Sequence, residues 1–96
     1  MAQKKLTFYE GAYTVELQPG APKNHIGGRC TVRGNTVSVP QGSVQQVMGG
    51  IQFYVYSAEG QRTPFSWGYH LIRRICDTKG ETLWENWDVQ EERARR

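Results

Sequence analysis

The sequence predicts an α+β fold, in which a mostly antiparallel sheet of about five or six short strands carries one main helix over about residues 64–79. Three observations lead to this prediction. Apolar and polar residues alternate in the first half of the chain, as in half-buried strands. The 11 glycines indicate many turns, and an apolar stripe at helical spacing follows Pro64. A small β-barrel with an inserted helix is the alternative.

The length and composition predict one globular domain over residues 1–96. A chain of 96 residues buries one core and is too short for a second. No apolar run approaches the roughly 20 residues that cross a bilayer, and no apolar stretch of a secretory signal follows Lys4 and Lys5. We therefore expect a cytosolic protein that does not bind membranes. The 2 cysteines, Cys30 and Cys76, are too few for a disulfide framework and are expected to be buried thiols.

The first half of the chain predicts two hairpins. Residues 6–10 and 13–17 alternate on either side of Glu10-Gly11-Ala12, which is typical of two strands joined by a turn. Gly34-Asn35 separates two short β-prone runs and tolerates the positive φ that a tight hairpin needs. One buried face would then consist of Cys30, Val32, Val37 and Val39.

A short helix and a strand are predicted next. Pro40 ends the preceding strand, and Ser43 with Gln46 matches a capping box at the start of a helix. Gly49-Gly50 would end this helix. Residues 51–56 then alternate, which predicts a strand with Tyr54 and Tyr56 on one face.

Residues 64–79 favour a helix over a strand. As a strand, each face would mix an arginine with aliphatic residues. As a helix, one stripe is apolar, whereas His70, Arg73 and Arg74 share the opposite face. Pro64 suits the first helical position, and Gly80 suits the end. After Gly80 a strand and a helix fit about equally well, and we favour a short strand over Thr82–Trp87 followed by a frayed or helical tail.

The charge distribution indicates an anionic partner. The net charge is only +3, but no acidic residue lies between Leu17 and Ala58. Two basic segments, within residues 17–58 and 60–80, would form a positive patch if the fold brought them together. The leading hypothesis is therefore a small non-enzymatic protein that binds a nucleic acid or a phosphorylated nucleotide. The residues expected to contact phosphate are Arg29, Arg33, His70, Arg73 and Arg74, and those expected to stack on bases are Tyr54 and Tyr56.

The second hypothesis is a protein-interaction module, such as a small inhibitor or an assembly subunit. Large aromatic side chains dominate the energetics of interfaces, so the expected partner-binding residues are Trp67, Trp84 and Trp87. So many aromatic residues in one small domain also suggest self-association into a homo-oligomer.

Enzymatic chemistry receives less support from the sequence. His25 with Cys30 and His70 with Cys76 lack the close pair spacing of a structural zinc site. A small hydrolase or transferase would depend on His70 or Cys30. We favour a non-enzymatic role and expect no metal or cofactor.

Overall fold

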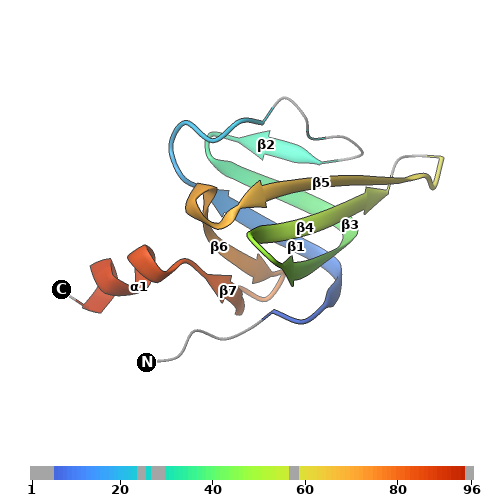
Figure 1. Ribbon diagram of the computed structural model, residues 1–96. Helices are drawn as coiled ribbons and strands as arrows, with labels where there is room; N and C mark the ends of the chain where they lie inside the picture. The colour runs from blue at the N-terminus through green and yellow to red at the C-terminus, as the bar shows by residue number, and fades with distance from the viewer. Residues whose placement is uncertain (1–5, 24–25, 27–29, 57–58, 95–96) are drawn as a thin grey trace.

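The part of the chain that the structure describes forms one antiparallel sheet and one short α-helix (Figure 1). The computed structural model describes residues 6–23, 26, 30–56 and 59–94. The strands in this part of the chain are β1 (Tyr9–Leu17), β2 (Thr31–Arg33), β3 (Thr36–Val47), β4 (Gly50–Tyr56), β5 (Arg62–Gly68), β6 (Ile72–Asp77) and β7 (Thr82–Glu85). A 3-10 turn, η1 (Tyr69–Leu71), joins β5 to β6, and the helix α1 (Trp87–Ala94) ends the described chain. No helix in these ranges is long and apolar enough to cross a membrane.

The strands follow the order β5-β4-β3-β1-β6-β7, and β2 pairs with β3 beside this path. The coarse prediction of an antiparallel sheet with a little helix is therefore confirmed. The predicted barrel alternative is wrong, because the path ends in β5 on one side and β7 on the other without closing.

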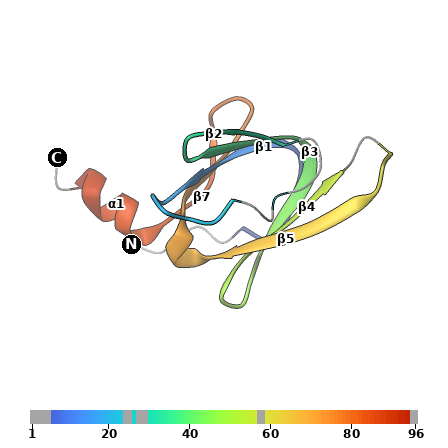
Figure 2. The same ribbon diagram turned by 90° about the horizontal axis from the view of Figure 1, so that it is seen from above.

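The sheet bends where Gly11 of β1 lies opposite Gly42 of β3. Between Val39 and Gly42, β3 has one residue more than β1, which is a β-bulge. Gly11 adopts a φ of 141°, which is open to glycine and strained for other residues. The bend brings β5 across from β1, with the core between them (Figure 2).

The core fills the concave side of this bent sheet. Every strand of the main path contributes to it, because alternate residues turn inward. Its largest fully buried side chains are Tyr13, Phe53, Leu17, Ile51, Ile72 and Ile75. Phe53 stacks on Phe65 with ring centroids 5.0 Å apart, so the aromatic residues of β4 and β5 pack as a unit.

The predicted helix over residues 64–79 is wrong, because this segment is β5, η1 and β6. The error has a physical cause in β6. Leu17 pairs with Ile72 and Glu16 with Arg74, so Arg73 is an extra residue in a bulge. The bulge lets Ile72 and Ile75, three residues apart, both face the core. Three-residue spacing of buried residues is also the pattern of a helix.

The predicted helix after Ser43 is also wrong. Residues 43–47 continue β3, because β1 and β4 pair with this stretch on its two sides and thereby satisfy its backbone. Pro40 does not end the strand, since it lies beside the bulge. Met48 and Gly49 form the turn to β4, with Gly49 at a φ of 85°.

The predicted hairpin within residues 6–17 is wrong, because β1 bends at Gly11 and continues as one strand. The hairpin at Gly34-Asn35 is confirmed, with β2 paired to the start of β3. Its predicted buried face is only partly formed. Val37 and Val39 are buried, whereas Val32 on the short outlying strand is 44% exposed. The favoured order of a strand and then a helical tail after Gly80 is confirmed as β7 and α1, but the strand ends at Glu85 and Trp87 already belongs to the helix.

Candidate functional site

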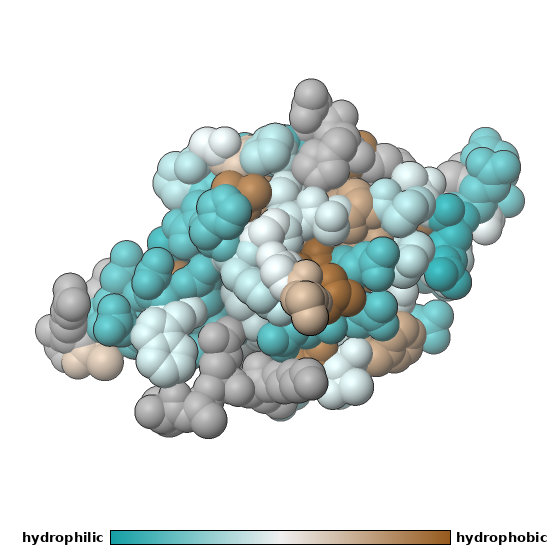
Figure 3. Space-filling view, in the orientation of Figure 1, coloured by the Kyte–Doolittle hydropathy of each residue, from teal (hydrophilic) through white to brown (hydrophobic). Residues whose placement is uncertain are grey.

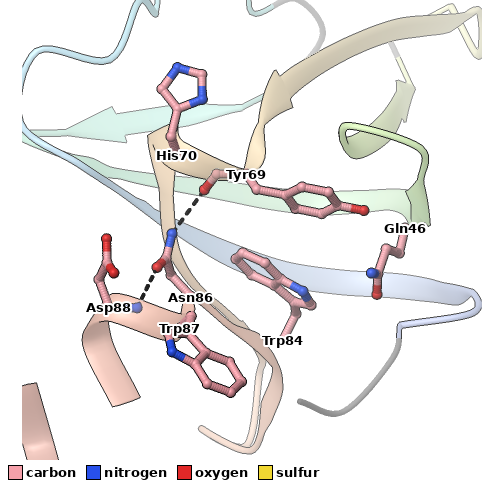
Figure 4. A pocket seen from close by; sticks show the side chains of 7 residues that line it. All are labelled: Gln46, Tyr69, His70, Trp84, Asn86, Trp87 and Asp88. Carbon is pink, nitrogen blue, oxygen red and sulfur yellow. Dashed lines mark hydrogen bonds between the residues drawn. The ribbon is translucent and has the colours of Figure 1, made fainter. Parts of the chain in front are cut away.

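A hollow of about 350 Å³ lies where η1, the end of β7 and the start of α1 meet the end of β3 (Figure 4). We call it the aromatic hollow, because three of its lining residues carry large rings. Its lining residues are Gln46, Tyr69, His70, Trp84, Asn86, Trp87 and Asp88. These residues are far apart in sequence, so the fold of the whole sheet is needed to assemble the site.

Trp84 has an unpartnered polar group in this hollow. Its side chain is 3% exposed and stacks on Tyr69, with ring centroids 5.7 Å apart. The indole N–H of Trp84 has no hydrogen-bond partner within the described chain. Figure 4 shows the nitrogen edge of this indole turned toward Gln46. A buried donor without a partner costs about 1–3 kcal/mol, so a ligand that brings an acceptor gains that interaction.

Asn86 fixes the geometry of the hollow. Its side-chain N–H₂ donates to the carbonyl oxygens of Tyr69 and Ile72, both at 2.9 Å. Its Oδ1 accepts the backbone N–H of Asp88 at 2.7 Å, which caps α1. One buried amide therefore connects η1, β6 and the first turn of α1.

Trp87 is the exposed ring of the site. It is the first residue of α1, and it is 50% exposed. On another side Trp87 borders a second hollow of about 220 Å³, whose other lining residues are Gln90, Glu91 and Ala94. Trp87 therefore offers ring surface between two concave regions, each of which includes one acidic residue, Asp88 or Glu91.

Arg73 links α1 to the sheet. From the β6 bulge, its guanidinium donates to Glu16 at 3.0 Å and to Glu92 of α1 at 3.2 Å. The hydrogen bond to Glu92 is the main reason that the pKa of Arg73 is raised, and Glu16 adds to it. Both contacts hold the guanidinium, so Arg73 acts as a tie between β1 and α1.

The predicted anion-binding residues that the structure describes lie on β2, β4, η1 and β6. Arg74 lies 3.4 Å from Glu85, and Arg33 is exposed on β2. Tyr54 and Tyr56 lie on the face of β4 opposite its buried residues, as predicted. His70 is exposed at the rim of the aromatic hollow, and Arg29 lies outside the described residues.

The three tryptophans have three different environments. Trp67 is 3% exposed and donates its indole N–H to the carbonyl oxygen of Pro22 at 2.8 Å, which places it in the core. Trp84 is equally buried but lines the hollow, and Trp87 is half exposed. The sequence prediction missed four lining residues, namely Gln46, Tyr69, Asn86 and Asp88. An asparagine just before a possible helix is a capping signal that could have identified Asn86.

The cysteines lie away from the aromatic hollow. Cys76 borders a separate, wider groove of about 710 Å³ over β1, β3 and β6. Cys30 is half buried, and its burial raises the pKa of its thiol. Among the described side chains, no three histidine, cysteine or acidic residues gather in a way that could hold a metal ion. His70 and Cys76 border different hollows, and His25 lies outside the described residues.

Comparison of the chain with protein-family models, with curated proteins and with solved structures found no match. The candidate site is therefore defined by its geometry: a concave aromatic surface at one end of an open antiparallel sheet.

Proposed function

We propose that this protein is a protein-interaction module that accepts a peptide segment of its partner in the aromatic hollow. The observation that carries the proposal is the unpartnered, buried indole N–H of Trp84 beside the half-exposed ring of Trp87. A peptide can supply a hydrogen-bond acceptor for the Trp84 N–H and a side chain that packs on the Trp87 ring. Its backbone carbonyls are hydrogen-bond acceptors, and its side chains can cover an exposed ring.

The size and composition of the hollow support this proposal. About 350 Å³ is within the range of sites that hold a small ligand or a few side chains. Tryptophan and tyrosine are over-represented among the residues that dominate binding energy at interfaces. Asn86 and the Arg73 tie hold the helix that carries Trp87, so less order has to be gained on binding.

The first test is the replacement Trp87→Ala. Peptides that bind the purified protein are selected from a random peptide library, and their affinities are measured by isothermal titration calorimetry. We expect Trp87→Ala to weaken binding about tenfold or more, because loss of a central aromatic anchor costs more than about 1 kcal/mol. The matched control is Val32→Ala, which removes an equally exposed apolar side chain outside the hollow.

Nuclear magnetic resonance can locate the bound peptide. The three indole N–H signals report on the hollow (Trp84, Trp87) and on the core (Trp67). We expect the first two signals to shift and the third to remain unchanged. Selected peptides that bind Trp87→Ala as tightly as the original protein, or that leave both hollow signals unmoved, would overturn the proposal.

A second candidate function follows from a different surface, the outer face of β4 and β5. Tyr54 and Tyr56 share this face, and the Arg62 guanidinium lies 4.1 Å from the Tyr54 ring centroid. Two aromatic rings and a cation on a sheet can stack on bases and contact phosphate. This arrangement favours an anionic ligand, namely single-stranded nucleic acid or a phosphorylated nucleotide.

The oligonucleotide dT12 tests the second candidate by fluorescence anisotropy at low salt, where phosphate contacts are strongest. We expect the Tyr54→Ala/Tyr56→Ala variant to lose about tenfold in affinity, because stacking is worth about 1–3 kcal/mol per base. Trp87→Ala serves as the control, since Trp87 belongs to the other surface. Absence of binding by the unmodified protein would exclude this candidate for nucleic acid.

A further inference from the structure

We infer that the partner segment is basic and places a lysine or arginine side chain against Trp87, between Asp88 and Glu91. This inference rests on the proposed function, because it specifies the chemistry of the peptide that the aromatic hollow accepts. It concerns the surface around Trp87, where Asp88 lines the aromatic hollow and Glu91 lines the second hollow, and not the buried floor of the aromatic hollow.

The charged side chains that the structure describes around Trp87 are negative. No described lysine or arginine side chain lines either hollow, whereas Asp88 lines one and Glu91 the other. Both acidic residues are exposed, and among the side chains that the structure describes neither carboxylate has a cationic partner. Tyr69 and His70 are the other titratable residues that line the aromatic hollow, and His70 lies at its exposed rim.

The guanidinium of Arg73, which contacts α1, does not reverse this sign. Arg73 forms ion pairs with both Glu16 and Glu92. These three side chains together therefore contain two carboxylates and one cation. Figure 3 shows a mostly hydrophilic surface over the end of the molecule that α1 forms. The net charge of +3 belongs to the whole chain and acts weakly here, because salt screens exposed charges beyond about 8–10 Å.

An exposed ring flanked by carboxylates is suited to a cation. The face of tryptophan attracts ammonium and guanidinium groups by about 0.5–1 kcal/mol at exposed sites. The aliphatic stem of lysine or arginine can lie along the ring while its charged end reaches a carboxylate. The backbone of the same segment can offer a carbonyl oxygen to the N–H of Trp84, so the two parts of the hollow recognise different parts of one peptide.

The unpartnered Trp84 N–H gives this inference a basis beyond surface charge. Acidic residues in the first turn of a helix are common, because they stabilise the helix dipole. The helix dipole alone therefore explains the presence of Asp88, and no ligand is needed to account for it. The buried donor has no such structural role, and it lies in the same hollow as Asp88.

The test uses four acetylated, amidated pentapeptides of the form Gly-Gly-Xaa-Gly-Gly, where Xaa is arginine, lysine, norleucine or glutamate. Norleucine keeps the aliphatic stem and removes the charge. Binding is followed through the indole N–H signals during NMR titration. We expect the arginine and lysine peptides to shift the Trp87 and Trp84 signals and to bind about fivefold or more tightly than norleucine, with glutamate weakest.

Protein variants provide the second arm of the test. In Asp88→Asn/Glu91→Gln, the preference for arginine over norleucine should fall to the roughly twofold that attraction to the Trp87 ring alone provides, whereas Glu81→Gln, an exposed acid outside both hollows, should keep the full preference. Equal binding of the norleucine and arginine peptides by the original protein would overturn the inference that the partner segment is basic, but not the proposed function. Failure of every pentapeptide and every library peptide to shift the hollow signals would overturn both.

Discussion

At the scale of single residues, the site depends on polar side chains whose roles arise from tertiary contacts. Asn86 was predictable as a helix cap because the capping signal is local. Its two hydrogen bonds to Tyr69 and Ile72 were not predictable, because these carbonyls come from another part of the chain. Sequence reasoning named Trp84 and Trp87 for their size alone. Only the packed structure shows that Trp67, of the same type, has a partner inside the core.

Asn86→Ala should destabilise the protein by about 2–4 kcal/mol, because it removes the helix cap and two hydrogen bonds, one of them buried. The measurement is the urea midpoint, followed by circular dichroism. Ser66→Ala, an exposed change on β5, is the matched control and should change the free energy of unfolding by less than about 0.5 kcal/mol. A loss for Asn86→Ala no larger than that of the control would contradict the role assigned to this amide.

At the scale of elements, the sequence predicted those strands that alternate regularly and failed where a bulge interrupts the alternation. Residues 51–56 alternate without a break and form β4 as predicted. In β6 the extra residue, Arg73, produces a pattern that also fits a helix. Periodicity reports which residues are buried. It cannot report whether a shift in phase comes from helical winding or from an inserted strand residue.

Gly42→Ala tests the bend between β1 and β3. A methyl group at position 42 would overlap the backbone carbonyl oxygen of Tyr54, which cannot move without disturbing the β3–β4 ladder. We expect a loss of about 1–3 kcal/mol in the free energy of unfolding, as for other overpacked sites. The control Gly49→Asn alters a glycine with open surroundings and a φ of 85°, a region that asparagine tolerates. Equal losses for the two variants would show that close packing at Gly42 is not limiting.

At the scale of the whole molecule, the strand order decides which charges lie beside the arginines that were predicted to form a positive patch. Distribution of charge along a sequence predicts a surface only when the order of strands is known. Here β1 lies between β3 and β6, so its Glu16 stands beside the arginines of β6. The prediction of an antiparallel sheet is confirmed, because it depends on many short alternating runs and not on any single one. The strand order could not be predicted, because pairing partners are not encoded locally.

The open sheet also determines how copies of this protein can meet. The main path of the sheet ends in β5 and β7, and β2, which pairs with β3 alone, is a third outer strand. Pro64 lies within β5, opposite Tyr54, whose carbonyl oxygen is directed toward Gly42 of β3. The backbone nitrogen of Pro64, which carries no hydrogen, therefore faces away from β4, at the free margin of the sheet. A strand that added to β5 would lack one backbone hydrogen bond at Pro64. At the other end of the main path, β7 has only four residues with which an added strand could pair. Growth of fibrils by strand addition is thus disfavoured at β5 and β7, and β2 has only three residues, so we expect any self-association to proceed through side-chain surfaces.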